Sequence, residues 1–73
     1  METTSLTLAE ALPIEQKRVR KLVEIYKDPM LKGAGNFAAR LMEIDLEKAE
    51  KAFAEGDTVG MLKAYNELKN YKE

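Results

Sequence analysis

The chain has 73 residues, enough for one small domain, and 12 lysine and arginine residues nearly balance 13 aspartate and glutamate residues for a net charge of −1. This balance argues against a strongly basic nucleic-acid-binding domain and against an acidic disordered tail. The chain has no cysteine, which excludes disulfides and thiolate metal sites, and no histidine, which removes the commonest general base and transition-metal ligand.

The hydrophobic fraction of 45% and the charged fraction of 34% are typical of a compact, soluble helical protein. No apolar run approaches the ~20 residues that a membrane-spanning helix needs. Residues 1–5 lack the basic segment and the long apolar segment of a secretory signal peptide. We therefore expect a cytoplasmic protein with no membrane partner.

An N-terminal arm is predicted over residues 1–12. Within it, Thr7 is followed three residues later by Glu10, which is the spacing of a helix capping box. This spacing indicates a short turn of helix before Pro13. We expect the leucines of the arm, such as Leu12, to hold it against the helices that follow.

The first main helix is predicted over residues 13–27. Pro13 suits a first helical position, because the N–H that proline lacks has no intrahelical partner there. Asp28-Pro29 is expected to end the helix, since a residue before proline avoids helical backbone. Apolar side chains recur at the spacing of one helix face, at Val19, Leu22, Val23 and Tyr26.

Two further helices are predicted over residues 36–55 and 57–71. Asn36 is a suitable N-cap for the second helix, Gly56 a suitable C-terminal stop, and Asp57 opens the third helix. Apolar seams with three- and four-residue spacing run along both helices: Ala39, Met42, Leu46, Ala49 and Phe53, then Met61, Ala64, Leu68 and Tyr71.

Three helices joined by short connections predict an all-α fold, a three-helix bundle with a short N-terminal helical turn or arm. The apolar arcs of the first two helices are wider than one seam. Such arcs either contact two neighbouring helices in the core or leave one flank for another protein or a second copy of the chain. The residues of this candidate contact flank are Ile14, Ile25, Phe37, Leu41 and Ile44.

Two charged residues, Arg18 and Asp45, interrupt these apolar arcs. A charge at such a position costs free energy unless it is paired. We expect the two side chains to form a structural ion pair across the contact between the first and second helices, or Asp45 to cap the nearby loop. The functional alternative is that Asp45 binds the cation of a ligand.

Basic residues concentrate between positions 17 and 32, with six bases against two acids, whereas positions 43 to 57 hold six acids against two lysines. This asymmetry favours antiparallel pairing of the first two helices, within the chain or between copies. The alternative is that the basic residues bind nucleic-acid phosphates. The candidate phosphate contacts are Lys17, Arg20, Lys21, Lys27 and Lys32.

The sequence assigns no catalytic residue, cofactor or metal site. Glu43, Glu47 and Glu50 share one helix face, but a carboxylate di-iron site in a bundle also needs histidine ligands. The glycines at 33 and 35 precede a helix without the strand, third glycine or Gly-Lys-Ser/Thr of a phosphate-binding loop.

Two resemblances accompany these patterns. Residues 49–68, AEKAFAEGDTVGMLKAYNEL, resemble the helical hairpin of a tetratricopeptide repeat, with the turn at Gly56-Asp57 and departures at Met61 and Leu68, where that family prefers alanine. The segments LTLAEALPIEQKRVR and EGDTVGMLKAYNELK are similar to a group of short, uncharacterised bacterial proteins, some from prophage-bearing regions. The second resemblance implies a shared scaffold and no activity.

Taken together, these features lead us to expect a small helical protein–protein interaction module that is not an enzyme and that binds another protein or a second copy of itself. The alternative is a nucleic-acid accessory protein that acts through the basic face of its first helix. The predicted mechanism is burial of the apolar flank, with the surrounding charges setting the orientation of the partner.

Overall fold

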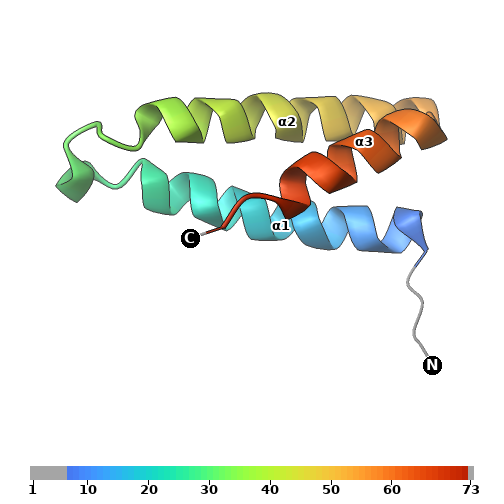
Figure 1. Ribbon diagram of the computed structural model, residues 1–73, viewed down its shortest axis with the longest axis horizontal. Coiled ribbons are helices and arrows are strands. Elements are labelled where there is room, and N and C mark those ends of the chain that lie inside the picture. Colours follow the sequence, from blue (N-terminus) through green and yellow to red (C-terminus); the bar gives the residue numbers. More distant parts are fainter. Residues whose placement is uncertain (1–6, 73) are drawn as a thin grey trace.

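The computed structural model describes residues 7–72 and has four helical elements (Figure 1). These are α1 (Leu8–Tyr26), the short 3-10 turn η1 (Pro29–Leu31), α2 (Asn36–Glu55) and α3 (Thr58–Lys69). All three α-helices pack against one another. The predicted all-α three-helix bundle is therefore confirmed. None of the helices within residues 7–72 is long and apolar enough to cross a membrane.

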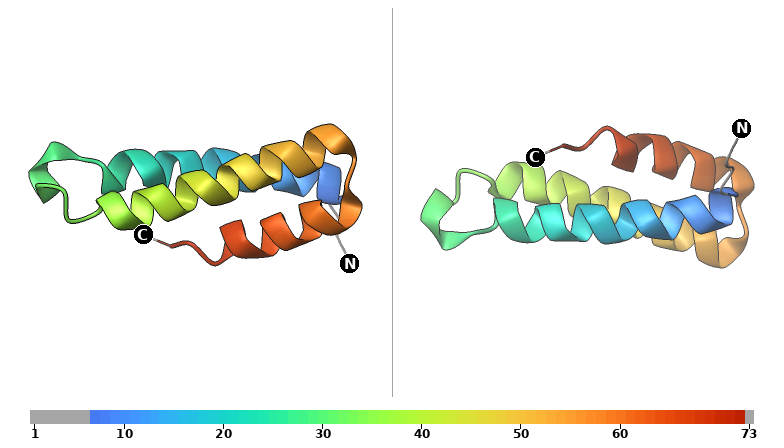
Figure 2. Two further views of the ribbon diagram at one scale, coloured as in Figure 1. Left: turned by 90° about the horizontal axis from the view of Figure 1, so that it is seen from above. Right: turned by 90° about the horizontal axis from the view of Figure 1, so that it is seen from below.

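The helices α1 and α2 form a long antiparallel hairpin, and α3 folds back over the end at which α1 begins (Figures 1 and 2). At 1.5 Å per residue, the 12 residues of α3 extend ~18 Å, whereas the 19 and 20 residues of α1 and α2 extend ~28–30 Å. The third helix therefore stops well before the connection between α1 and α2.

The first helix begins at Leu8, so the boundary predicted at Pro13 is wrong. The predicted capping box is present: the Thr7 hydroxyl accepts from the Glu10 N–H at 3.2 Å, and Glu10 Oε1 accepts from the Thr7 N–H at 3.0 Å. Pro13 lies inside the helix, on its exposed side, where it removes one main-chain hydrogen bond. The cap and complete burial of Leu12 offset that loss. The predicted arm's residues 1–6 lie outside the described residues.

The connection between α1 and α2 is shaped by one close backbone approach. Gly35 occupies the N-cap position of α2 that the sequence assigned to Asn36, and no side chain caps this helix end. A Cβ atom on Gly35 would collide with the main-chain carbonyl of Tyr26 at the end of α1. Glycine is required here because the loop turns directly against the end of the preceding helix.

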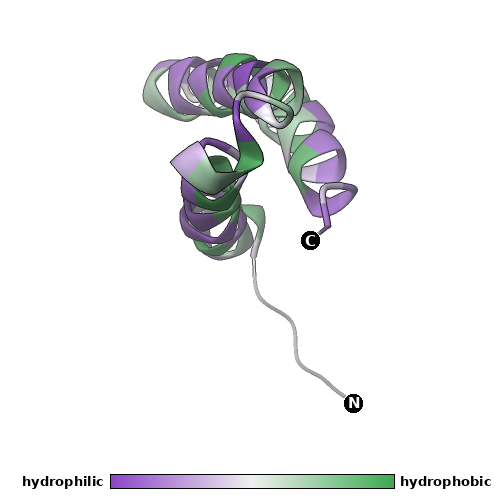
Figure 3. Ribbon diagram, turned by 90° about the vertical axis from the view of Figure 1, so that its left-hand side faces the viewer, coloured by the Kyte–Doolittle hydropathy of each residue, from purple (hydrophilic) through white to green (hydrophobic). Residues whose placement is uncertain are grey.

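The core lies along the shared axis of the three helices. Figure 3 shows apolar and polar bands alternating along each helix, as the helical periodicity requires. Most seam positions are buried as predicted, but Phe53 is exposed and Ala52 takes the buried place, next to α3. The buried core residues are Leu12, Val19, Leu22 and Val23 of α1, Ala39, Met42, Leu46 and Ala49 of α2, and Ala64 and Leu68 of α3.

Replacing Gly35 by alanine is expected to lower the free energy of unfolding by about 2 kcal/mol. The added Cβ would lie 2.9 Å from the carbonyl carbon and 3.0 Å from the Cα of Tyr26, and these backbone atoms cannot rotate away. Thermal unfolding followed by circular dichroism measures the loss. The control is Gly56→Ala, which has open space around it and suffers only from its positive φ of 68°, at a cost of about 1 kcal/mol. Equal losses in the two variants would contradict this account.

Candidate functional site

The outer face of α2 carries an apolar stripe, Phe37, Leu41 and Ile44, which we call the α2 stripe. The Phe37 side chain is 77% exposed and Leu41 is 41% exposed, while Ile44 is half-buried. The spacing of four and then three residues keeps the three side chains on one side of the helix. This side faces away from the buried residues of α2. The stripe is therefore an apolar surface held on a rigid element.

The other two residues of the predicted contact flank lie elsewhere. Ile14 and Ile25 are exposed on α1, 11 residues and ~16 Å apart along the helix. Ile14 lies three turns nearer the start of α1 than Ile25. The structure therefore does not bring the five predicted residues into one patch, and of the five only Phe37, Leu41 and Ile44 share one side of a helix.

The end of α3 continues into a segment, Asn70–Lys72, that we call the C-terminal strap. Arg18 of α1 donates from its two terminal nitrogens to the carbonyl oxygens of Leu68 and Tyr71, both at 2.8 Å. The Tyr26 hydroxyl donates to the Lys72 carbonyl at 3.1 Å. These bonds satisfy carbonyls near the helix end that have no intrahelical partner, and they fix the end of α3 against α1.

The opposite side of the strap is held by α2. The Tyr71 hydroxyl donates to Asp45 Oδ2 at 2.5 Å. Lys48 lies 3.9 Å from the other oxygen of the same carboxylate. Because the strap is bonded to both α1 and α2, it runs between them and separates Ile25 from the α2 stripe.

The predicted ion pair between Arg18 and Asp45 is therefore wrong. Arg18 instead pairs with Glu15 at 3.0 Å and binds the carbonyls of Leu68 and Tyr71. Asp45 binds the Tyr71 hydroxyl. The alternative prediction, that Asp45 caps the nearby loop, is also wrong, because the partner of Asp45 is Tyr71 in the strap. Both predicted side chains are satisfied through Tyr71, a residue that the sequence assigned to a helix seam.

The environment of Tyr71 changes its acidity. Partial burial, followed by the hydrogen bond to Asp45 and the charge of that carboxylate, raises the pKa of Tyr71 from 10.0 to about 12. The proton therefore stays on the phenol over the whole neutral range. Tyr71 can serve as a stable donor to Asp45, whereas a role as a general base at neutral pH would require a much lower pKa.

Two of the five candidate phosphate contacts are engaged within the bundle. Arg20 lies 3.3 Å from Glu50, and Lys27 lies 2.6 Å from Glu43, so both pairs join α1 to α2. The hydrogen bond from Lys27 lowers the pKa of Glu43. The sequence left antiparallel pairing of the basic and acidic helices open, within the chain or between copies, and the structure shows the pairing within the chain (Figure 1). The remaining candidates are exposed: Lys17, Lys21 and Lys32.

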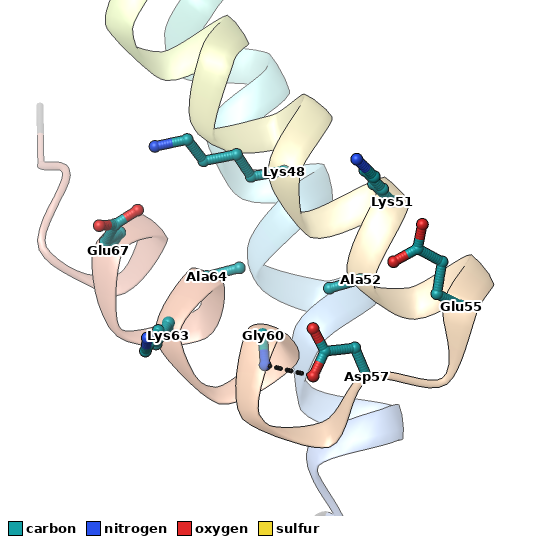
Figure 4. Close-up of a pocket in the computed structure, with 9 residues that line it drawn as sticks. All are labelled: Lys48, Lys51, Ala52, Glu55, Asp57, Gly60, Lys63, Ala64 and Glu67. Atoms are coloured by element: carbon teal, nitrogen blue, oxygen red, sulfur yellow. Dashed lines mark hydrogen bonds between the residues drawn. The ribbon is translucent and has the colours of Figure 1, made fainter.

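Two hollows that the sequence did not indicate lie between the helices. The larger, about 360 Å³, lies between α2 and α3 and is drawn in Figure 4. Lysines and acids both line it, including Lys48, Lys63 and Glu67. Asp57 also lines it, and its side chain caps α3 by accepting from the Gly60 N–H at 3.0 Å. The smaller hollow, about 210 Å³, lies between α1 and α2 beside Gln16 and Phe53. Neither hollow gathers groups of one charge.

No protein family, curated protein or solved structure matches the chain. The hairpin of α2 and α3 has the turn at Gly56-Asp57 that the tetratricopeptide resemblance implies, with Gly56 in the left-handed conformation at φ 68° and Asp57 as the N-cap. Both resemblances remain predictions. Residues 7–72 contain no group of three or more Asp, Glu, His or Cys side chains arranged to hold a metal ion.

Replacing Tyr71 by phenylalanine is expected to lower the free energy of unfolding by about 1–2 kcal/mol. The change removes the hydroxyl that donates to Asp45 and leaves a carboxylate that is only 15% exposed with Lys48 at 3.9 Å. Urea unfolding measures the loss. Tyr65→Phe is the matched control, and an equal loss there would contradict a special role for Tyr71.

The raised pKa of Tyr71 also predicts a pH dependence. The folded state holds the phenolic proton more tightly than the unfolded state, so this stabilisation is complete below pH 10 and is lost as the pH rises from 10 to about 12. The free energy of unfolding should therefore fall more steeply in this range for the unmodified chain than for Tyr71→Phe. Parallel curves above pH 10 would contradict the bond to Asp45.

Proposed function

We propose that this chain is a small protein–protein interaction module that binds through the α2 stripe and has no catalytic activity of its own. The observation that carries the proposal is the exposure of Phe37, 77% of whose surface is open to solvent on the outside of a helix. Aromatic side chains at such positions are common anchors of protein interfaces, because their burial against a partner gives a large free-energy gain.

The geometry of the stripe suits another helix as the partner. Phe37, Leu41 and Ile44 follow the spacing of four and three residues with which one helix packs along another. The other side of α2 is buried against α1 and α3, which hold the helix in place. A partner would meet side chains that are already positioned, so little conformational entropy would be lost on binding.

The charges beside the bundle support contact with protein over contact with phosphates. Arg20 and Lys27 are paired with acids of α2, and Glu24 adds negative charge to the same part of α1. Repeated unpaired bases would be needed to release counterions from a nucleic acid. The nucleic-acid alternative therefore becomes an outcome of the test below.

The substitution Phe37→Glu should reduce capture of a protein partner from lysate of the native host at least tenfold, since burying the ring contributes about 1.5–3 kcal/mol. Tagged wild-type chain and the variant are crosslinked in parallel, with and without nuclease. The control is Val59→Glu, because Val59 is 64% exposed on α3 and lies away from the stripe.

Both variants should keep the helicity and melting temperature of the wild-type chain, because neither side chain contributes to the core. Equal capture by Phe37→Glu and Val59→Glu would overturn the proposal. Capture that disappears with nuclease would favour the alternative through the exposed bases.

A further inference from the structure

We infer that the partner of the α2 stripe is a second copy of this chain, packed antiparallel through α2. This inference rests on the proposed contact function. The helical spacing of the stripe continues to Lys48, which lies four residues after Ile44. The residues at 37, 41, 44 and 48 are spaced by four, three and four positions, so the spacing is the same in both chain directions.

A pattern of this kind is complementary to itself. In an antiparallel pair related by a twofold axis, Leu41 faces Ile44 of the second copy, and Phe37 faces Lys48 of the second copy. Each contact occurs twice. The two central layers are purely apolar, and at each end the aliphatic part of Lys48 covers the Phe37 ring with its ammonium group near the ring face.

The flanking charges select the antiparallel orientation. Arg40 and Glu47 lie seven residues apart on the same edge of the stripe, and both are exposed. In the antiparallel pair, Arg40 lies opposite Glu47 of the second copy at both ends of the contact. A parallel pair would place Lys48 against Lys48 of the second copy, which like charges disfavour, and would separate Arg40 from Glu47.

The rest of the fold leaves this surface accessible. The strap meets α2 through Tyr71 and Asp45 on one side of the stripe. The acids that bind α1, Glu43 and Glu50, lie on the other side, beyond Arg40 and Glu47. Among residues 7–72, Arg40 makes one ion-pair contact, a long one of 3.8 Å with Glu43. A domain this small has a limited core, and burial of a further apolar stripe between two copies would add to its stability.

The experiment is sedimentation velocity on the purified full chain over a concentration range from about 1 μM to about 1 mM, which spans the affinities expected of a short helix contact. The wild-type chain should pass from monomer to dimer. Phe37→Glu should remain monomeric, whereas Val59→Glu should dimerise like the wild-type chain. Circular dichroism confirms that each variant is folded.

Charge reversal tests the orientation. Arg40→Glu alone and Glu47→Arg alone should each weaken self-association about tenfold, because each places like charges opposite one another at two related positions. Mixing the two variants should restore dimers, since every acid of one chain then lies opposite a base of the other. The double variant R40E/E47R should also restore self-association.

The outcomes separate the two proposals. A wild-type chain that stays monomeric at all concentrations overturns the second copy as partner, and Phe37-dependent capture of another protein would still uphold the contact function. Dimers that are equally strong in Phe37→Glu overturn the α2 stripe as the interface for self-association. Dimers that depend on Phe37, but whose charge-reversed variants do not recover on mixing, overturn the antiparallel arrangement.

Discussion

One guanidinium group fixes the end of α3 against α1. Arg18 binds the carbonyl oxygens of Leu68 and Tyr71 with two bonds of 2.8 Å, at the end of a helix whose last carbonyls have no N–H partner inside the helix. Charge-assisted hydrogen bonds of this kind are stronger than neutral ones. They hold a helix of only 12 residues against α1, and they stop it at a defined point on the α1–α2 hairpin.

The position at which α3 ends determines what the rest of the molecule exposes. Beyond that point the strap continues between α1 and α2, held by Tyr26 on one side and by Asp45 on the other. On the outer face of α2, Phe37 and Leu41 stay exposed and Ile44 is half-buried. The same interactions that complete the core therefore leave the α2 stripe open to a partner.

Several charged side chains of the bundle pair with one another across the contact between α1 and α2. The basic α1 and the acidic α2 are joined by Arg20–Glu50 and Lys27–Glu43. Exposed ion pairs contribute little to stability, but they disfavour other alignments of the two helices. Arg40 and Glu47 remain on the outer edge of α2, where we propose that they set the orientation of a second copy.

Local sequence patterns determined the helices, the Thr7 capping box, the turn at Gly56 and most of the core, because helical periodicity and capping depend on neighbours within a few residues. The predicted start of the first helix at Pro13 was wrong, because the Thr7 cap and the burial of Leu12 offset the hydrogen bond that a proline inside the helix removes. Only the tertiary structure decided the partners of Arg18 and Asp45 and the separation of Ile25 from the α2 stripe. Those outcomes depend on where α3 ends in space, which brings Tyr71 to residues that lie 26 and 53 positions away in the chain.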